Sequence, residues 1–316
     1  MSLYGLDTQA ATFRAAMAGQ RLHHAWLFVG PRGVGKASFA DYAARLLLGA
    51  DDDESQGAKL LAAGSHPDFR RLERLPNEKT GNLARNITVD QVRHLRALFA
   101  TGTAISNRRV IIIDSIDDME RGAANAVLKS LEEPPASTIF LLISHQPGRL
   151  LPTIRSRCRT MAFAPLDDNA MKLVLETKIP QLPSDARAYL IANAGGSVAT
   201  ALAYAENDMA AIDTMLEKLA RTGDPTNGVR SKLAQTLSLK AALPRYEAFL
   251  ERAPTFIAAK ARSGEGLYVQ RALTAWSGAS KLSQVAIAQS LPPETVVFEM
   301  AGYVASLATA ERDAKA

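Results

Sequence analysis

The stretch that decides the fold is HAWLFVGPRGVGKASFADYAARLLLG, residues 24–49. An apolar run leads into a glycine-rich turn, and a helical pattern follows, which is the order of elements in a phosphate-binding loop. Glycine lets backbone N–H groups face phosphate oxygens, and the amino end of the following helix adds a partial positive charge. The predicted nucleotide-binding residues of this loop are Gly30, Gly33, Val34, Gly35, Lys36, Ala37 and Ser38.

The loop departs from the pattern G-x-x-x-x-G-K-[ST] at one position. Gly30, Gly35 and Lys36 match it, but Ala37 stands where a Ser or Thr hydroxyl normally ligates magnesium. Ser38 does not replace that hydroxyl, because one step along a helix turns a side chain by about 100°. The sequence therefore predicts a phosphate cradle with defective magnesium placement.

Outward from the loop, apolar runs alternate with helical patterns as far as residue 165, which predicts an α/β domain with a doubly wound parallel sheet. RRVIIIDS (108–115) and STIFLLISHQ (137–146) are further buried strands. From residue 166 onward Ala- and Leu-rich helical patterns replace the strands. We expect an α/β domain over 1–165, a small helical domain over 166–225 and an all-helical domain over 226–316.

Asp114 ends a predicted strand at the position of a second magnesium-orienting carboxylate. A glutamate that orients the attacking water usually follows in hydrolysing enzymes of this type, but Ser115 follows here and is no general base. We expect Asp117 and Asp118 to cap the next helix, with substitution for the glutamate as the alternative. A second part of the hydrolysis machinery is therefore missing.

Net charge, cysteine content and the length of the apolar runs limit the classes of protein to which the chain can belong. The net charge of +5 over 316 residues is compatible with nucleic-acid contact without demonstrating it. Cys158 is the only cysteine, so we expect neither a disulfide framework nor a cysteine-based zinc site. The start of the chain does not read as a secretory signal and the apolar runs are too short to span a bilayer, so we expect a cytoplasmic protein with no membrane partner.

Four segments in a fixed order resemble bacterial clamp-loader subunits of DNA polymerase III, and among them the delta-prime family. The segments are LHHAWLFVGPRGVGKASFA, SHPDF, ANAVLKSLEEPP and LLPTIRSRC, and the likeness covers about residues 1–205. It implies an AAA+ fold (a P-loop NTPase-like sheet), a helical lid and a helical collar. It also implies a hetero-pentameric ring with gamma/tau-like motor subunits and a delta-like subunit, which loads a sliding clamp onto primer-template DNA.

The resemblance gives a role to Arg157, with Ser156 and Cys158 as its motif: an arginine finger that acts in trans on ATP bound by a neighbouring subunit. A guanidinium offers charge-assisted donors to the γ-phosphate. A solvated surface arginine is the alternative. His145, at the end of a strand where the family has a sensor, is read equally well as a polar sensor or as a surface histidine.

Two departures from the family pattern are visible. Family members often carry four zinc-binding cysteines, whereas ADDDESQGAK (50–59) stands in their place, so we expect no zinc. Motor subunits carry a lid arginine where this chain has Ala199.

Together, Ala37, Ser115 and Ala199 predict a subunit that does not hydrolyse ATP and requires no cofactor, with ATP or ADP binding left open. The alternatives are an ATP-hydrolysing gamma/tau-like motor subunit and a stand-alone DNA-repair ATPase.

Overall fold

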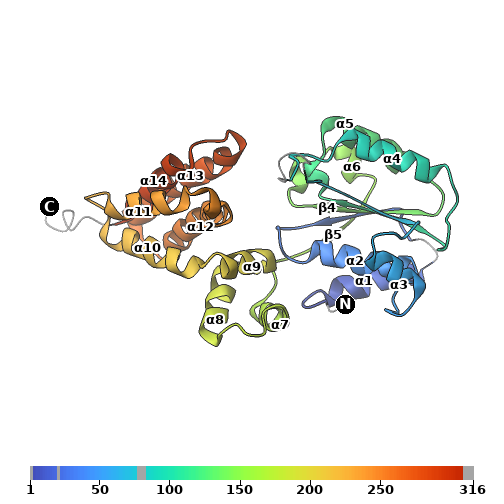
Figure 1. Ribbon diagram of the computed structural model, residues 1–316, viewed down its shortest axis with the longest axis horizontal. Coiled ribbons are helices and arrows are strands. Elements are labelled where there is room, and N and C mark those ends of the chain that lie inside the picture. Colours follow the sequence, from blue (N-terminus) through green and yellow to red (C-terminus); the bar gives the residue numbers. More distant parts are fainter. Residues whose placement is uncertain (1–2, 20–21, 77–82, 309–316) are drawn as a thin grey trace. The chain divides into compact units, whose positions relative to one another are not determined.

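The computed structural model describes residues 3–19, 22–76 and 83–308 (Figure 1). Its contacts divide the chain into two compact units. The first unit comprises residues 1–187 and 195–199, and the second comprises 188–194 and 200–316. The boundary expected near residue 225 stays a prediction.

The first unit is built on a five-stranded sheet in the order β2-β3-β4-β1-β5, in which all neighbouring strands are parallel. The strands are β1 (Ala25–Val29), β2 (Phe69–Glu73), β3 (Arg109–Asp114), β4 (Thr138–Ser144) and β5 (Arg159–Ala162). The predicted parallel sheet is confirmed. Because β1 lies between β4 and β5, the loop that follows β1 leaves from the interior of the carboxyl edge, where ligands bind in open α/β sheets.

Helices cover both faces of the sheet (Figure 1). On one face lie α1 (Asp7–Ala18), α2 (Lys36–Leu47) and α3 (Gln56–Ala62); on the other lie α4 (Val89–Phe99), α5 (Arg121–Glu132) and α6 (Pro152–Arg155). Strand side chains alternate between the faces. Leu27 packs in the cluster that holds Val127 of α5, whereas the ring of its neighbour Phe28 lies 5.2 Å from that of Phe39 in α2. This two-sided burial explains why the strands read as continuous apolar runs.

Asp68 of the HPD segment ties a long connection to the sheet. Its buried carboxylate accepts hydrogen bonds from the backbone N–H groups of Ala104 (2.7 Å), Ile105 (2.9 Å) and Ser106 (2.9 Å). Burial alone would raise the pKa of Asp68, but these three donors outweigh it and hold the pKa below its ordinary value. The HPD segment therefore fixes the path of the chain into β3.

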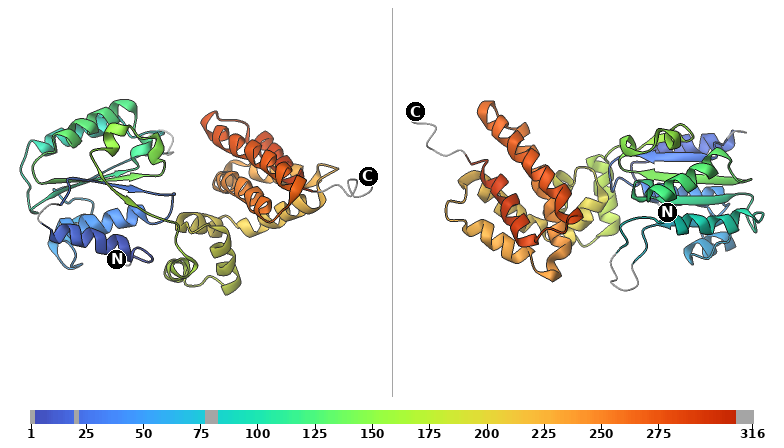
Figure 2. Two further views of the ribbon diagram at one scale, coloured as in Figure 1. Left: turned by 180° about the vertical axis from the view of Figure 1, so that it is seen from behind. Right: turned by 90° about the horizontal axis from the view of Figure 1, so that it is seen from above.

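After β5 the described chain is helical, as predicted. The helices are α7 (Asp168–Lys178), α8 (Ser184–Asn193), α9 (Val198–Glu206), α10 (Met209–Thr222), α11 (Gly228–Leu237), α12 (Leu243–Arg262), α13 (Gly266–Ala288) and α14 (Pro293–Ala305). In the second unit α12 packs against α13, and α11 against α14 (Figure 2). None of the helices within the described ranges has the length and apolar character that crossing a membrane requires.

One buried ion pair links helices inside the second unit. Arg252 of α12 donates to Asp213 of α10 at 2.6 Å and to Asn193 of α8 at 2.7 Å, and Tyr189 donates to Asp213 at 2.8 Å. Each charged group is thus paired and hydrogen-bonded, as burial demands.

Candidate functional site

The glycine loop joins β1 to α2 at the carboxyl edge of the sheet. Gly35 directly precedes α2 with a φ of 94°, and Gly33 has a φ of 75°, in the left-handed region that favours glycine. Within the described residues, the backbone N–H groups of Gly33 to Lys36 have no hydrogen-bond acceptor. The Val34 side chain is fully buried, so this residue offers only its N–H. The loop therefore keeps a row of donors suited to an anion.

Lys36 is turned into the loop. Its Nζ donates to the carbonyl of Gly30 at 2.6 Å and to the carbonyl of Pro31. Only 3% of the residue is exposed. Burial lowers the pKa of Lys36 to about 8, and the carboxylates of Asp117 and Asp114 act in the opposite direction. In this conformation the ammonium group is hydrogen-bonded to the loop's own carbonyl oxygens.

The turn at residues 195–199, which precedes and opens α9, lies directly against the loop within the first unit. The N–H of Val198 donates to the carbonyl of Gly33 at 2.9 Å. A Cβ placed on Gly33 would lie 2.1 Å from Oγ of Ser197 and 2.8 Å from Cβ of Ala199. Ala199 is therefore close to the loop and brings a methyl group there. This helix supplies no cation at that position.

Magnesium ligands are lacking at the loop. Ala37 occupies the first turn of α2 without a hydroxyl, and Ser38, one step on, is exposed. Asp114 is engaged by Arg71 of β2, whose Nη1 lies 3.1 Å from Oδ2 and which also pairs with Asp41 of α2. Burial raises the pKa of Asp114, and Arg71 acts against this rise. A guanidinium between two carboxylates leaves a donor set that does not fit magnesium.

The sequence did not identify Arg71, since a charged residue in the segment FRRLE is ordinary for an edge strand. Among the described residues, no group of three or more His, Cys, Asp or Glu side chains is arranged to hold a metal ion.

The acidic residues after β3 are engaged within the protein. Buried Ser115 donates to Oδ2 of Asp118 at 3.1 Å. Asp117 accepts from Oγ of Ser144 at 2.9 Å and from the N–H of His145. The prediction that Asp117 and Asp118 cap the next helix is wrong. They lie in a separate 3-10 turn, Ile116–Asp118, and bind β4 and Ser115, while α5 begins only at Arg121.

His145 follows β4 at the edge of the loop. Burial, together with the positive charges of Lys36 and Arg32, lowers its pKa to about 4. Its Nδ1 is buried and has no hydrogen-bond partner in the described part of the chain. The imidazole is therefore neutral at physiological pH and lies beside the loop lysine.

Arg157 lies at the opposite edge of the sheet from the loop. It follows α6 and precedes β5, which runs parallel to β1 with Arg159 aligned to Trp26 and Ala162 to Val29. At about 3.3 Å per residue, this aligned stretch alone separates the two edges by roughly 10 Å. The arginine is therefore not directed at the chain's own loop.

The Arg157 guanidinium is held at the surface by two neighbouring elements. Its Nη1 donates to the carbonyl of Thr153 at 2.9 Å, and its Nη2 lies 2.8 Å from Oε1 of Glu132. About a third of the side chain, 34%, remains exposed. Glu132 belongs to the quoted LEEPP segment, but nothing in the sequence pattern pointed to this contact.

The residues that flank Arg157 anchor its turn. The Ser156 hydroxyl donates to the carbonyl of Thr153 at 3.1 Å. Cys158 packs against the core cluster, and burial raises the pKa of its thiol to about 12. The thiol thus stays protonated and serves packing rather than redox or metal chemistry.

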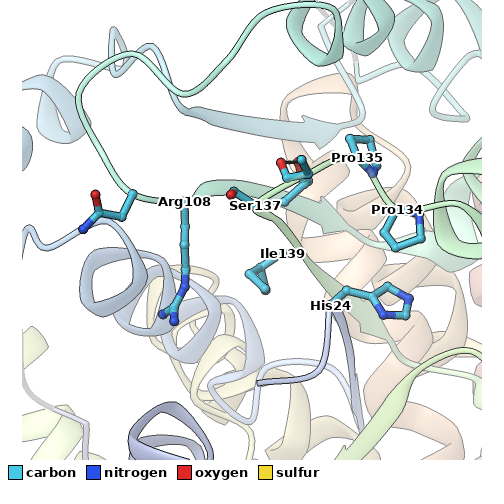
Figure 3. Close-up of a pocket in the computed structure, with 9 residues that line it drawn as sticks. His24, Arg108, Pro134, Pro135, Ser137 and Ile139 are labelled. Carbon is cyan, nitrogen blue, oxygen red and sulfur yellow. Dashed lines mark hydrogen bonds between the residues drawn. The ribbon is translucent and has the colours of Figure 1, made fainter. Parts of the chain in front are cut away.

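A cavity of about 320 Å³ lies at the amino edge of the sheet (Figure 3). Its walls include His24 before β1, Arg108 before β3, and Pro134 and Pro135 before β4. Nε2 of His24 lies 3.1 Å from the carbonyl oxygen of Leu131. None of the residues predicted for the nucleotide loop lines this cavity.

The chain is similar to known proteins in sequence. A family model described as DNA polymerase III, delta subunit, matches residues 6–167. DNA polymerase III subunit delta′ of Pseudomonas aeruginosa is 42% identical over 193 residues, which are 58% of this chain and 57% of that protein. The subunit delta′ of Bacillus subtilis is 36% identical over 193 residues, 60% of this chain and 55% of that protein.

A relative with a different subunit name also occurs. DNA polymerase III subunit tau of Bacillus subtilis is 28% identical over 246 residues, 74% of this chain and 42% of that protein. The chain matches little more than half the length of the delta′ relatives named above.

Proposed function

Because the chain belongs to the DNA polymerase III delta-subunit family, whose model covers residues 6–167, we propose that it is a delta-prime-like clamp-loader subunit. In this proposal it does not hydrolyse ATP. It completes the ATP site of a neighbouring subunit with Arg157 and so assists ATP-driven loading of a sliding clamp during DNA replication. The delta′ relatives, 36% and 42% identical, support the clamp-loader assignment.

One contrast carries the proposal: the chain's own loop lacks groups that ATP hydrolysis needs, while Arg157 is partly exposed at the other edge of the sheet. Asp114 is bound by Arg71, and Lys36 is bound by loop carbonyls. Hydrolysis needs a magnesium ion and an oriented water, and neither Ala37 nor Ser115 can serve them. An arginine directed away from its own loop can serve a nucleotide only if another chain holds that nucleotide.

The proposal extends to partners and cofactors. The chain joins gamma/tau-like motor subunits and a delta-like subunit in a hetero-pentameric ring in the cytoplasm. It reaches the clamp and primer-template DNA through that ring. It requires neither zinc nor nucleotide of its own. The helices from α11 to α14 form the collar in this proposal.

A motor subunit is the second candidate, favoured by the relative named tau. Ala37, Ser115 and Ala199 disfavour it, because each removes a group from a different part of an ATPase site. A stand-alone repair ATPase would equally need these groups.

Reconstitution separates the candidates. We expect the purified chain to show no ATP turnover alone, to co-elute with the motor and delta-like subunits on size-exclusion chromatography, and to increase DNA-stimulated hydrolysis by them. Steady turnover by the isolated chain that disappears in Lys36→Ala would instead identify an ATPase, which is a motor if it also co-elutes with the other subunits. Failure to co-elute with either subunit would contradict the clamp-loader assignment.

A further inference from the structure

Glu132, the last residue of α5, contacts Arg157. The proposed function gives Glu132 no role. Its Oε1 lies 2.8 Å from Nη2 of Arg157, which follows α6. The two side chains form an ion pair.

Glu132 and Arg157 are each held in place by buried neighbours. Leu131, directly before Glu132, and Ile154, one turn before Arg157, are each 1% exposed and belong to the same core cluster. The Arg157 N–H donates to the carbonyl of Ile154 at 3.2 Å, and Cys158 packs against the same cluster. The geometry of the pair is thus set by the core rather than by mobile loops.

The guanidinium keeps donors for a further anion. An arginine carries five N–H donors. Nη1 donates to the Thr153 carbonyl at 2.9 Å and to the Ser156 hydroxyl at 3.4 Å, while Nη2 forms the ion pair with Glu132. Among the described residues, neither Nε nor Nη2 donates a hydrogen bond. Glu132 therefore orients the group without using up its hydrogen-bonding capacity.

We propose that Glu132 is a positioning residue for Arg157: it holds the guanidinium in the orientation from which it meets the phosphates of a nucleotide on a neighbouring subunit. This inference rests on the proposed role of Arg157. A long side chain that is ordered before the nucleotide arrives loses less freedom when it binds, so transition-state contact is easier. The pair is partly exposed, 34% on Arg157 and 42% on Glu132, so the effect is modest.

The test is a double-mutant cycle in the reconstituted complex. At the one ATP site that Arg157 serves, we expect Glu132→Gln to lower kcat for hydrolysis by about 3- to 5-fold, in line with a partly exposed ion pair, while KM for ATP stays unchanged. Glu133→Gln, which removes the adjacent exposed carboxylate, should leave kcat at the wild-type value. In an Arg157→Ala background, Glu132→Gln should add no further loss.

A second readout uses the chain alone. Relaxation of the Arg157 Nε–H signal should show a more mobile side chain in Glu132→Gln, with an unchanged melting temperature. If Arg157→Ala is slow but Glu132→Gln has normal kcat, or slows the Arg157→Ala complex equally, the positioning role is wrong and the finger stands. If Arg157→Ala itself has no effect, the proposed finger is wrong and the inference is overturned with it.

Discussion

The isolated chain should bind ATP and ADP weakly, because its loop lysine already has partners. Lys36 donates to the carbonyls of Gly30 and Pro31. A hydrogen bond from a charged donor contributes about 1.5–3 kcal/mol, so freeing Lys36 from both costs about 3–6 kcal/mol. At about 1.4 kcal/mol per tenfold change, nucleotide affinity falls by on the order of 10² to 10⁴ relative to a loop with a free lysine.

The size of this effect makes the prediction measurable. If an open loop of this kind binds nucleotide at about 1 μM, this loop should bind with a Kd on the order of 0.1–10 mM. Titration calorimetry with ATP and magnesium gives the Kd directly. Lys36→Met removes the ammonium group and should change the Kd by less than about threefold, since the wild-type lysine contributes little to binding. A melting curve checks that the variant is folded.

Tight nucleotide binding that depends on Lys36 would contradict this prediction. Micromolar binding by the wild-type chain that is lost in Lys36→Met would show that the lysine leaves its carbonyl partners readily. The reasoning from the Lys36 contacts would then be refuted.

Three further changes test other parts of the structure. Burial lowers the pKa of His145 to about 4, so below pH 6.5 the unfolded chain takes up a proton that the folded chain does not, and stability falls as the pH drops toward 4. His145→Gln should therefore reduce the stability lost between pH 7 and pH 5 by about 1–2 kcal/mol in urea unfolding; an unchanged pH dependence would contradict the burial of His145. Asp68→Asn places an amide against three N–H donors and should destabilise the chain by about 2–4 kcal/mol in the same assay; a loss below about 0.5 kcal/mol would contradict that role. Gly33→Ala drives a methyl group against Ser197 and should accelerate hydrogen exchange at the Val198 amide. The control Gly49→Ala, at a position with a φ of 66° and open space around it, should leave that exchange unchanged. Equal exchange in both variants would refute the packing of this turn on the loop.

The sheet and the helical remainder could be predicted because their signals are local. Buried parallel strands such as β3 and β4 need continuous apolar runs, and a glycine loop between a strand and a helix is specific. The resemblance also led to Ala199, which does lie at the loop.

Contacts between distant residues could not be predicted in this way. Arg71 and Asp114 meet only because β2 pairs with β3 in register, with Arg71 opposite Ile112. The contact between Glu132 and Arg157 depends on how α5 and α6 pack. The capping role predicted for Asp117 and Asp118 is wrong because a capping pattern does not reveal a competing 3-10 turn, in which Asp117 binds β4 and Asp118 binds Ser115.

The central claim is that Arg157 acts on a nucleotide held by another subunit. Arginine fingers contribute about 10³ to 10⁵ in rate in GTPases, and this chain would serve only one of several sites in a ring. The direct measurement is pre-steady-state ATP hydrolysis by the complex assembled with Arg157→Ala, compared with Arg155→Ala as a control from the same turn. The account predicts that one kinetic phase slows by at least about 10²-fold in the Arg157 variant, that the other phases and assembly persist, and that Arg155→Ala behaves as wild type. A complex that assembles with Arg157→Ala and shows every phase at the wild-type rate would contradict it.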